Sequence, residues 1–305
     1  MINHKTKNTS TVKNIFCYYK TKIYDIIFWH SEFKGGALIK IGVIGANGKM
    51  GKEVVKLVKA ENDLELSIAV DKFYNLEDKY DFKIDNDVEH ALKNNELDVV
   101  VDFTQPSVVF ENINLYQKYK VKAVIGTTGL TNEQIEQIKK MSKENNTGII
   151  IAPNFSIGAI LMMKFAAMAS KYFSNAEIIE YHHNQKKDAP SGTSIKTAQL
   201  MIKENKNFKL GNCPETETIK GSRGGCYEEN NEGNIQIHSV RMPGFVASQQ
   251  VIFGSDGQIL KIHHDTINRE CYMGGVKIAI EYLYKNNEFV YGLENILWHY
   301  QTSQY

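Results

Sequence analysis

The stretch EYHHNQKKDAPSGTS, residues 180–194, concentrates groups that can move protons and bind anions. Histidine titrates near neutrality, so His182 or His183 could donate or accept a proton at physiological pH. Lys186 adds a cation, and the Pro-Ser-Gly-Thr turn leads into a predicted helix whose first N–H and hydroxyl groups can hold a carboxylate. The stretch therefore indicates proton transfer beside an anion site. Residue type alone leaves open a packed structural histidine at either position and a merely solvated Lys187.

The spacing of the two histidines does not favour a metal site. Successive side chains of a strand point to opposite faces, so His182 and His183 in a strand would be separated. No HxxxH or HExxH spacing supplies further ligands. We therefore expect no metal and assign the two histidines different roles.

The elements that would position this chemistry begin with a glycine-rich loop near the front of the chain. The apolar strand IKIGVIG runs into GANGKMG and then into the helical KEVVKLVKA. Glycines at 45, 48 and 51 leave room for a pyrophosphate against backbone N–H groups, at a helix N-terminus that favours negative charge. A tight strand–helix turn without a ligand is the alternative. A second strand, LELSIAVD, follows in the expected place and favours a dinucleotide site.

Asp71 and Lys72 at the end of that second strand bear on the choice of cofactor. An acid in this position can accept hydrogen bonds from the adenosine ribose hydroxyls. Lys72 could contact a 2′-phosphate or could be a solvated surface lysine. The pair therefore predicts NADH, NADPH or both, without a preference.

Strand–helix alternation continues through the first half of the chain. Three more apolar strands end in DFT (102–104), GTT (126–128) and APNF (152–155), and Thr131 with Gln134 forms a capping-box pattern between the last two. Such strands predict a parallel sheet covered on both faces. Ligands of these sheets lie beyond the carboxyl ends of the strands. The three ends should therefore converge on the nicotinamide half of the cofactor.

After Phe155 the strand–helix alternation ends, and the order of predicted elements becomes that of an α+β domain. A Met-rich segment, IGAILMMKFAAMASKYF, predicts a helix in a core or a subunit interface, and strands are predicted at EIIEYHH, NIQIHSVRM, SQQVIFG and QILKIHH. The fold class is thus α/β: residues 38–154 form a Rossmann-type doubly wound parallel sheet. Residues 155–283 form a smaller α+β domain for substrate binding and oligomerisation. Residues 284–305 are expected to return to the first domain.

Composition excludes several other classes of protein. The 36 lysines and arginines nearly balance the 35 acids, which argues against nucleic-acid and membrane-surface binding. There is no apolar run of about 18 residues that would predict a transmembrane helix. The 4 cysteines are scattered without a CxxC pair, so we expect reduced thiols and a cytoplasmic protein.

Residues 1–37 differ from the rest of the chain. They are rich in Lys, Asn and Tyr, and charged residues interrupt their one apolar part, NIFCYYKTKIYDIIFWH, so a signal peptide is not indicated. We interpret them as a disordered or translated leader, with the domain starting at Leu38 after a non-AUG start. A targeting segment is the alternative.

Five motifs carry a resemblance to a known family. In chain order they are GANGKMG, GTTG, APNFSIG, HHNQKKDAPSGT and IHSVRMPG. From about Ile39 to the C-terminus the chain resembles the dihydrodipicolinate reductase (4-hydroxy-tetrahydrodipicolinate reductase) family of the diaminopimelate–lysine pathway. The HHxxKxDAPSGT string is far more specific than the glycine loop. Residues 1–37 have no counterpart.

The resemblance implies hydride transfer from NADH or NADPH to a cyclic, unsaturated dicarboxylic imine, in a protein that closes its domains and forms a homotetramer. It implies His182 as proton donor and acceptor, Lys186 as second proton donor, and His183, Gly192 and Thr193 as holders of the substrate carboxylates. The cofactor contacts that it implies are Gly45, Ala46, Asn47, Gly48, Lys49, Met50, Asp71, Lys72, Gly126, Thr127, Thr128, Ala152, Pro153, Asn154 and Phe155.

Two features leave questions open. The family often has a Gly-His-His or similar run where this chain has ASQQ, residues 247–250, which puts a role of those side chains in doubt. Arg241 could attract a dianionic substrate or form a strand-end salt bridge. The competing functions are another two-domain NAD(P) dehydrogenase of amino-acid metabolism and a non-catalytic dinucleotide sensor. A catalytic cysteine would favour the first and loss of His182 or Lys186 the second, and the sequence has neither feature.

Overall fold

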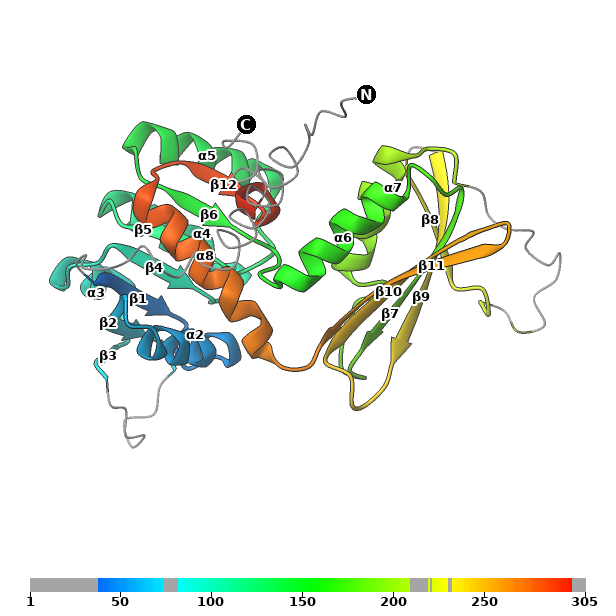
Figure 1. The fold of residues 1–305 in the computed structure, drawn as a ribbon. Coiled ribbons are helices and arrows are strands. Elements are labelled where there is room, and N and C mark those ends of the chain that lie inside the picture. Colours follow the sequence, from blue (N-terminus) through cyan, green and yellow to red (C-terminus); the bar gives the residue numbers. More distant parts are fainter. Residues whose placement is uncertain (1–37, 74–81, 209–218, 220, 230–231, 298–305) are drawn as a thin grey trace, which may run out of the picture.

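The computed structural model describes residues 38–73, 82–208, 219, 221–229 and 232–297. These residues form two sheets with their helices, one in each half of the molecule (Figure 1). The expected leader, residues 1–37, lies outside the described residues, as do residues 298–305.

The first sheet has seven parallel strands in the order β12-β6-β5-β4-β1-β2-β3. Helices cover both of its faces, with α2 and α8 against one and α3, α4 and α5 against the other. This arrangement confirms the predicted doubly wound α/β fold. The strands are β1 (Ile39–Ile44), β2 (Leu64–Val70), β3 (Ile84–Asp85), β4 (Val99–Asp102), β5 (Lys122–Ile125), β6 (Ile149–Ile151) and β12 (Phe289–Tyr291). The helices are α2 (Lys49–Ala60), α3 (Val88–Asn94), α4 (Pro106–Lys118), α5 (Asn132–Asn145) and α8 (Met273–Lys285).

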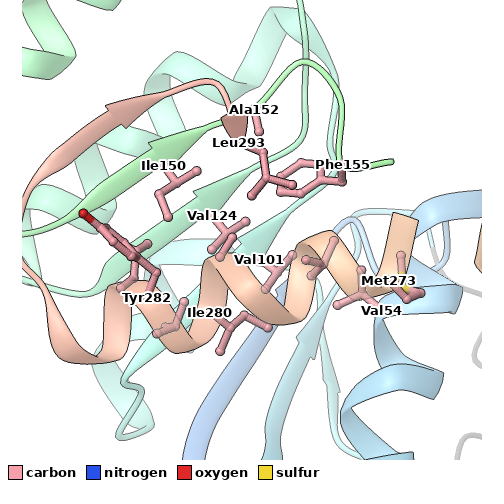
Figure 2. Packing of buried hydrophobic residues seen from close by; sticks show 14 of the residues in the cluster. Val54, Val101, Val124, Ile150, Ala152, Phe155, Met273, Ile280, Tyr282 and Leu293 are labelled. Carbon is pink, nitrogen blue, oxygen red and sulfur yellow. The ribbon is translucent and has the colours of Figure 1, made fainter. Parts of the chain in front are cut away.

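Helix α8 lies on the first sheet, although the predicted boundary at 283 places it in the second domain. Its apolar stripe, including Ile280, packs against Val101 of β4 and Val124 of β5 (Figure 2). Each such fully buried side chain contributes about 1.5–3 kcal/mol. The amphipathic pattern of a helix does not say which sheet the helix covers, so the sequence alone could not assign α8 to a sheet. Strand β12 pairs with β6 in this sheet.

The glycine loop between β1 and α2 leaves no space for a Cβ atom at two of its glycines. Gly45 has a positive φ of +79°, and a Cβ atom there would lie 2.7 Å from the Phe103 carbonyl oxygen. A Cβ atom on Gly51 would lie 2.0 Å from the Gly45 carbonyl oxygen. Gly48 is the N-cap residue of α2 and brings no capping side chain of its own. Close contacts within the chain itself therefore require glycine at positions 45 and 51, and the contact of this loop with a pyrophosphate stays a prediction.

Gly51→Ala is expected to weaken NADH binding by about tenfold or more, because overpacking against the loop backbone costs about 1–3 kcal/mol and displaces the start of α2. Titration of the variant with NADH, followed by fluorescence, measures the change in Kd. Gly274→Ala is the matched control, since its Cβ would make only an ordinary 3.4 Å contact with the Ile157 side chain. An unchanged Kd for Gly51→Ala would contradict the expectation.

The second sheet has five strands in the order β11-β10-β7-β9-β8. All pairs are antiparallel except β7 with β9, which run parallel. Helices α6 and α7 pack on one face and enclose a separate core around Phe253 (Figure 1). The strands are β7 (Asn175–His182), β8 (Gly225–Glu229), β9 (Glu232–Arg241), β10 (Ala247–Ser255) and β11 (Gln258–Thr266), and the helices are α6 (Ile157–Ala169) and α7 (Gly192–Glu204), with a 3₁₀ turn, η2, at Arg269–Tyr272.

Local capping signals place the helices of both domains. Thr131 and Gln134 form the predicted capping box at the start of α5. Ser156 caps α6 and Ser191 caps α7 through their hydroxyl oxygens. The strand preceding α7 ends at His182, so the loop 183–190 joins the histidine motif to the start of that helix.

Candidate active site

A cavity of about 350 Å³ lies between the two domains. The first domain contributes the strand ends, with Phe103 after β4, Gly126 after β5 and Phe155 after β6. Opposite them, the second domain contributes His182 and the start of α7. The predicted convergence of the three strand ends is thus present, and the histidine motif faces them. The full set of lining residues that sequence reasoning named is Met50, Gly126, Pro153, Asn154, Phe155, His182, Ser191 and Thr193.

A second pocket, of about 680 Å³, adjoins the glycine loop. Gly45, Asn47, Gly48, Asp71 and Lys72 line it, all of which the sequence predicted. Phe103 lines both hollows, so the two form neighbouring parts of one long site.

The Asp71 carboxylate is held in place at the far end of the nucleotide pocket. Its two oxygens accept hydrogen bonds from the backbone N–H groups of Asn47, at 2.8 Å, and Phe73, at 2.9 Å. These bonds fix the carboxylate at the mouth of the glycine loop, where ribose hydroxyls can still reach its remaining lone pairs. The residues present thus fit the adenosine half of a dinucleotide.

The remaining predicted cofactor residues occupy different surroundings. Thr127 and Thr128 line a smaller hollow of about 100 Å³ beside Tyr291. Ala46 and Ala152 are buried in the apolar core on either side of the loop ends. Lys49 is exposed and lines neither of the two large hollows.

A buried carboxylate that the sequence analysis did not single out lies at the end of β4. Asp102, at the end of β4, is fully buried and accepts hydrogen bonds from the Thr104 N–H (2.8 Å) and hydroxyl (2.6 Å) groups, from Asn112 (3.0 Å) and from the Tyr116 hydroxyl (2.7 Å). Burial and the neighbouring Asp102 raise the pKa of Tyr116, which keeps its hydroxyl a donor. Asp102 thereby joins the loop after β4 to helix α4.

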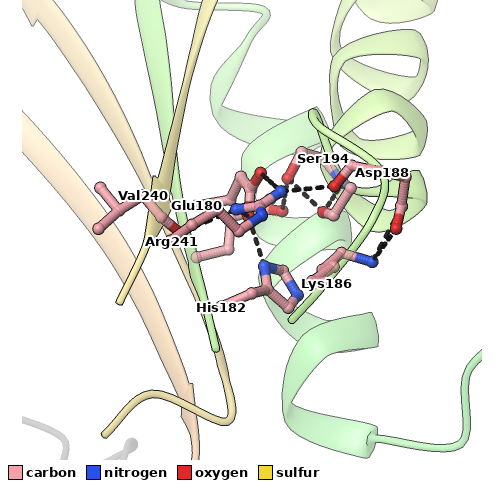
Figure 3. Close-up of polar contacts among 9 residues, drawn as sticks. Glu180, His182, Lys186, Asp188, Ser194, Val240 and Arg241 are labelled. Carbon is pink, nitrogen blue, oxygen red and sulfur yellow. Dashed lines mark hydrogen bonds and ion pairs between the residues drawn. The ribbon is translucent and has the colours of Figure 1, made fainter. Parts of the chain in front are cut away.

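His182 is anchored through one ring nitrogen. Its Nδ1 atom is hydrogen-bonded to the Glu180 carboxylate two residues earlier on β7 (Figure 3). Residues i and i+2 of a strand share a face, so both side chains lie on the face of β7 that α7 covers, and His182 lines the cavity. Because Nδ1 is engaged, Nε2 is the nitrogen available to a ligand.

Glu180 is fully buried and also forms a bidentate ion pair with Arg241 of β9. The guanidinium donates to the two carboxylate oxygens at 2.7 and 2.9 Å (Figure 3). Burial alone would raise the pKa of Glu180, but the hydrogen bonds from His182 and Arg241 outweigh it and lower the pKa to about 2. Of the two interpretations of Arg241, the strand-end salt bridge is the one present here.

Lys186 does not line the cavity. Its ammonium group donates to both oxygens of Asp188, at 2.7 and 2.9 Å, and Figure 3 shows the group directed at that carboxylate. The hydrogen bond from Lys186 lowers the pKa of Asp188, so the acid stays ionised and the pair persists near neutral pH. The Lys186 side chain is about one-fifth exposed (21%), and that of Asp188 is mostly exposed (59%).

The start of α7 is clamped to the second sheet by buried polar side chains. Ser191 and Ser194 share a 2.8 Å hydrogen bond, and the Ser194 hydroxyl donates to the Gln249 side-chain oxygen of β10 at 2.8 Å. The Gln249 amide in turn donates to the Thr197 hydroxyl at 2.8 Å. The ASQQ segment thus has a structural role that the sequence left in doubt, because it fixes the helix terminus that faces the cavity.

His183 and Gly192 are exposed and do not line the cavity. His183 lies just beyond the end of β7, where the alternation of strand side chains no longer governs it. A Cβ atom on Gly192 would meet no atom within 4 Å. Both residues nonetheless flank the loop that joins His182 to α7.

Several lining residues were not predicted as site residues, among them His264 and Arg269. His264 of β11 lies 3.3 Å (Nε2 to Oγ) from Ser156, the N-cap of α6, and burial lowers the pKa of His264, which keeps its ring neutral. Arg269 of η2 also lines the cavity. Among the described residues that line it, no other is an arginine or a lysine. No spacing in the sequence links these residues to the histidine motif, since the β10–β11 pairing and the η2 turn bring them there.

Comparison with known proteins identifies the family of the chain. Residues 39–155 match the family described as "Dihydrodipicolinate reductase, N-terminus", and residues 158–297 match "Dihydrodipicolinate reductase, C-terminus". The chain belongs to the dihydrodipicolinate reductase family. The resemblance inferred from five motifs is thereby confirmed.

Members of the dihydrodipicolinate reductase family resemble this chain over nearly their whole length. The 4-hydroxy-tetrahydrodipicolinate reductase of Geobacillus thermodenitrificans is 46% identical over 267 residues, which cover 85% of this chain and 99% of the relative. That of Gloeothece citriformis is 47% identical over 273 residues, covering 85% and 98%. The solved dipicolinate-bound dihydrodipicolinate reductase from Paenisporosarcina sp. TG-14 is 42% identical, with a TM-score of 0.76, and the match covers 85% of this chain and 99% of that one.

As a dihydrodipicolinate reductase family member, the chain is an NAD(P)H-dependent oxidoreductase of lysine and diaminopimelate biosynthesis. Among the described residues there is no group of three or more His, Cys, Asp or Glu side chains that could hold a metal ion. In the same part of the chain, no helix has both the length and the apolar character that a membrane crossing requires.

Proposed function

We propose that this chain converts 4-hydroxy-tetrahydrodipicolinate to tetrahydrodipicolinate: the hydroxyl group leaves as water to give dihydrodipicolinate, which then takes up a hydride and a proton, with His182 and Lys186 as the proton donors. The observation that carries the proposal is the cavity between the domains. There, an anchored histidine and a clamped helix N-terminus face the ends of β4, β5 and β6. A dicarboxylate with a reducible carbon–nitrogen double bond needs a proton donor, such as the histidine, and an anion-binding group, such as the helix N-terminus.

The dinucleotide is held by the glycine loop, with Asp71 at its adenosine end and the loops after β5 and β6 at its nicotinamide end. The proposed cofactor contacts are the fifteen residues that the sequence analysis named, of which Gly45 is the first along the chain and Phe155 the last. When bound, the nicotinamide supplies the hydride. Lys72 lines the nucleotide pocket, where it can meet a 2′-phosphate, so use of both NADH and NADPH is proposed.

His182 supplies the proton that the reduced substrate needs. Hydride addition to a conjugated imine leaves electron density that a nearby acid must protonate. The Nε2–H of charged His182 is placed to donate, because Nδ1 is occupied by Glu180. After donation, the ring remains held by that same bond in position to accept a proton again.

Lys186 acts as the second proton donor once it leaves Asp188. In the present arrangement its ammonium is paired with that exposed carboxylate. Exposed pairs contribute only about 0–1 kcal/mol, so an incoming dianion can compete for the lysine. Closure of one domain on the other would bring the loop 183–190 over the substrate and exclude water.

The two substrate carboxylates are proposed to bind at the start of α7, at Gly192 and Thr193, and at His183. Helix N-termini offer free N–H groups and a partial positive charge. Thr193 lines the cavity already, whereas His183 and Gly192 would join it on closure. Arg269 adds a positive charge at the opposite wall.

We also propose a domain division that follows the packing, and a homotetramer. Residues 38–155 and those from about 273 onward form the dinucleotide-binding domain, and the intervening residues form the substrate and oligomerisation domain. Among the described residues, helices cover only one face of the second sheet. The other face carries apolar residues such as Ile259, which is 70% exposed, and can therefore bury them only against another subunit.

A cytoplasmic location is proposed from the thiols. Cys271 is a free cysteine, and secreted proteins rarely keep a thiol unpaired.

A coupled assay tests the reaction. The enzyme that condenses pyruvate with aspartate semialdehyde generates the substrate in place, and oxidation of NADH or NADPH is followed by absorbance. We expect oxidation that depends on both the substrate-generating enzyme and this chain, with measurable rates for each cofactor. No oxidation at high concentrations of this chain would reject the proposed substrate, and oxidation with a different amino-acid-derived carbonyl instead would favour another dehydrogenase.

A further inference from the structure

The buried contacts of Glu180 link three parts of the site. Its carboxylate accepts from His182, from both terminal nitrogens of Arg241, and from the Ser239 hydroxyl. Arg241 also donates to the Asp188 carbonyl oxygen at 2.7 Å. Glu180 therefore joins strand β7 to strand β9 and, through Arg241, to the loop that carries Lys186.

The ionised state of Glu180 restricts what His182 can do. An ionised carboxylate is only an acceptor, so the Nδ1 atom that contacts it must carry a hydrogen. Neutral His182 is then the Nδ1–H tautomer, with a bare Nε2 facing the cavity. In the charged ring, Nε2–H is the acid. A second-sphere carboxylate fixes both the tautomer and the orientation of a functional histidine in this way.

Arg241 lowers the free-energy cost of keeping the Glu180 carboxylate ionised in the protein interior. A lone buried carboxylate would be costly, whereas a bidentate guanidinium compensates its charge and stops it from rotating. Because Arg241 does not line the cavity, it stabilises Glu180 and does not meet the substrate. The Glu180–Arg241 ion pair therefore supports His182 and does not contact the ligand.

We propose that Glu180 is a positioning residue that holds His182 as the Nδ1–H tautomer, with Nε2 presented to the reacting atoms, and that Arg241 keeps Glu180 ionised and fixed for this task. The proposal rests on the proposed function, in which His182 Nε2 transfers the proton. The competing explanation is a purely structural ion pair between β7 and β9, which would be indifferent to the histidine.

The same strand offers a matched control. Glu177 also pairs with an arginine and a histidine, Arg223 at 2.6 Å and His238 at 2.8 Å. An odd residue separation places Glu177 on the opposite face of β7 from Glu180, and it does not line the cavity. Glu180→Gln and Glu177→Gln thus remove the same charge from the same kind of pairing, and only one of them supports His182.

The test combines kinetics with histidine-ring NMR. Glu180→Gln is expected to lower kcat by about 10- to 100-fold, the scale on which second-sphere partners act, with both KM values changed less than about threefold. Glu177→Gln should keep kcat within about twofold. In ¹⁵N-histidine-labelled wild type above its titration range, the His182 ring should show a protonated Nδ1 and a bare Nε2. In Glu180→Gln that preference should be lost.

Every result of these measurements either supports or overturns the positioning role of Glu180. A wild-type Nε2–H tautomer, a full kcat in Glu180→Gln, or equal losses in the two variants would overturn the proposal. If Glu180→Gln does not fold, the double variant Glu180→Gln/Arg241→Gln removes both buried charges together and takes its place. The tautomer measurement on wild type needs no substrate, so a failed reductase assay with an Nδ1–H ring rejects the proposed function alone.

Discussion

His182→Gln lowers kcat by about 10²- to 10⁴-fold while leaving the Kd for NADH within about threefold, as the expected result of removing a general acid. Glutamine keeps a polar side chain of similar length, and it can still hydrogen-bond to Glu180 through its amide. It cannot deliver a proton near neutral pH. The cofactor pocket lies around the glycine loop and Asp71, on the other side of Phe103, so the loss should fall on turnover. Steady-state rates and a fluorescence titration with NADH measure the two quantities.

A matched control for His182→Gln is available on β11. His263 is an exposed histidine whose ring pairs with Asp265 at 2.8 Å, and it does not line the cavity. His263→Gln should change kcat by less than about twofold. Equal losses in kcat and in cofactor affinity for His182→Gln, or a fall in its Tm large enough to unfold it at the assay temperature, would mean that His182 is a structural residue.

Lys186→Ala is expected to lower kcat by about 10²-fold or more with almost no effect on folding. Within the described part of the chain, its side-chain partner is the exposed Asp188 carboxylate, and such a pair contributes about 0–1 kcal/mol. In a chain of this size the Tm should therefore change by less than about 4 °C. Steady-state kinetics and a thermal melt on the same preparation separate the two effects.

Lys187 provides the control for that prediction. It is the adjacent lysine, it is exposed, and it lines no part of the cavity. Lys187→Ala should keep both kcat and Tm. A large drop in the Tm of Lys186→Ala, or rates equal to those of Lys187→Ala, would count against a proton-donor role and leave Lys186 as a surface cation paired with Asp188.

Local sequence patterns predicted the parts of the site that depend on neighbouring residues. The glycine loop was predictable because only glycine fits where a Cβ would clash with backbone, as at Gly45 and Gly51. The strand ends were predictable because parallel strands bring their carboxyl ends to one edge. The capping box of α5 follows from a side-chain oxygen placed three residues before an N–H group.

The residues that sequence reasoning missed depend on pairing across long separations. Glu180 looked like one polar position in a strand, yet register between β7 and β9 brings Arg241 to it, 61 residues away. Gln249 reaches Ser194 across 55 residues. Asp102 was noticed only as a strand end, although burial makes it the acceptor for the Tyr116 hydroxyl. For Glu180 and Asp102, the available signal in the sequence was a single acidic residue between apolar neighbours in a predicted strand.

The sequence by itself determined the family, the doubly wound sheet, the dinucleotide loop and the histidine motif, because each rests on residue types at short, fixed spacings. The tertiary structure decided which sheet α8 covers, which nitrogen of His182 is free, and that Lys186 rests on Asp188 outside the cavity. Those outcomes depend on which distant strands pair and on what becomes buried between them. Neither is encoded in spacing along the chain, since both emerge only when the two sheets have formed and packed.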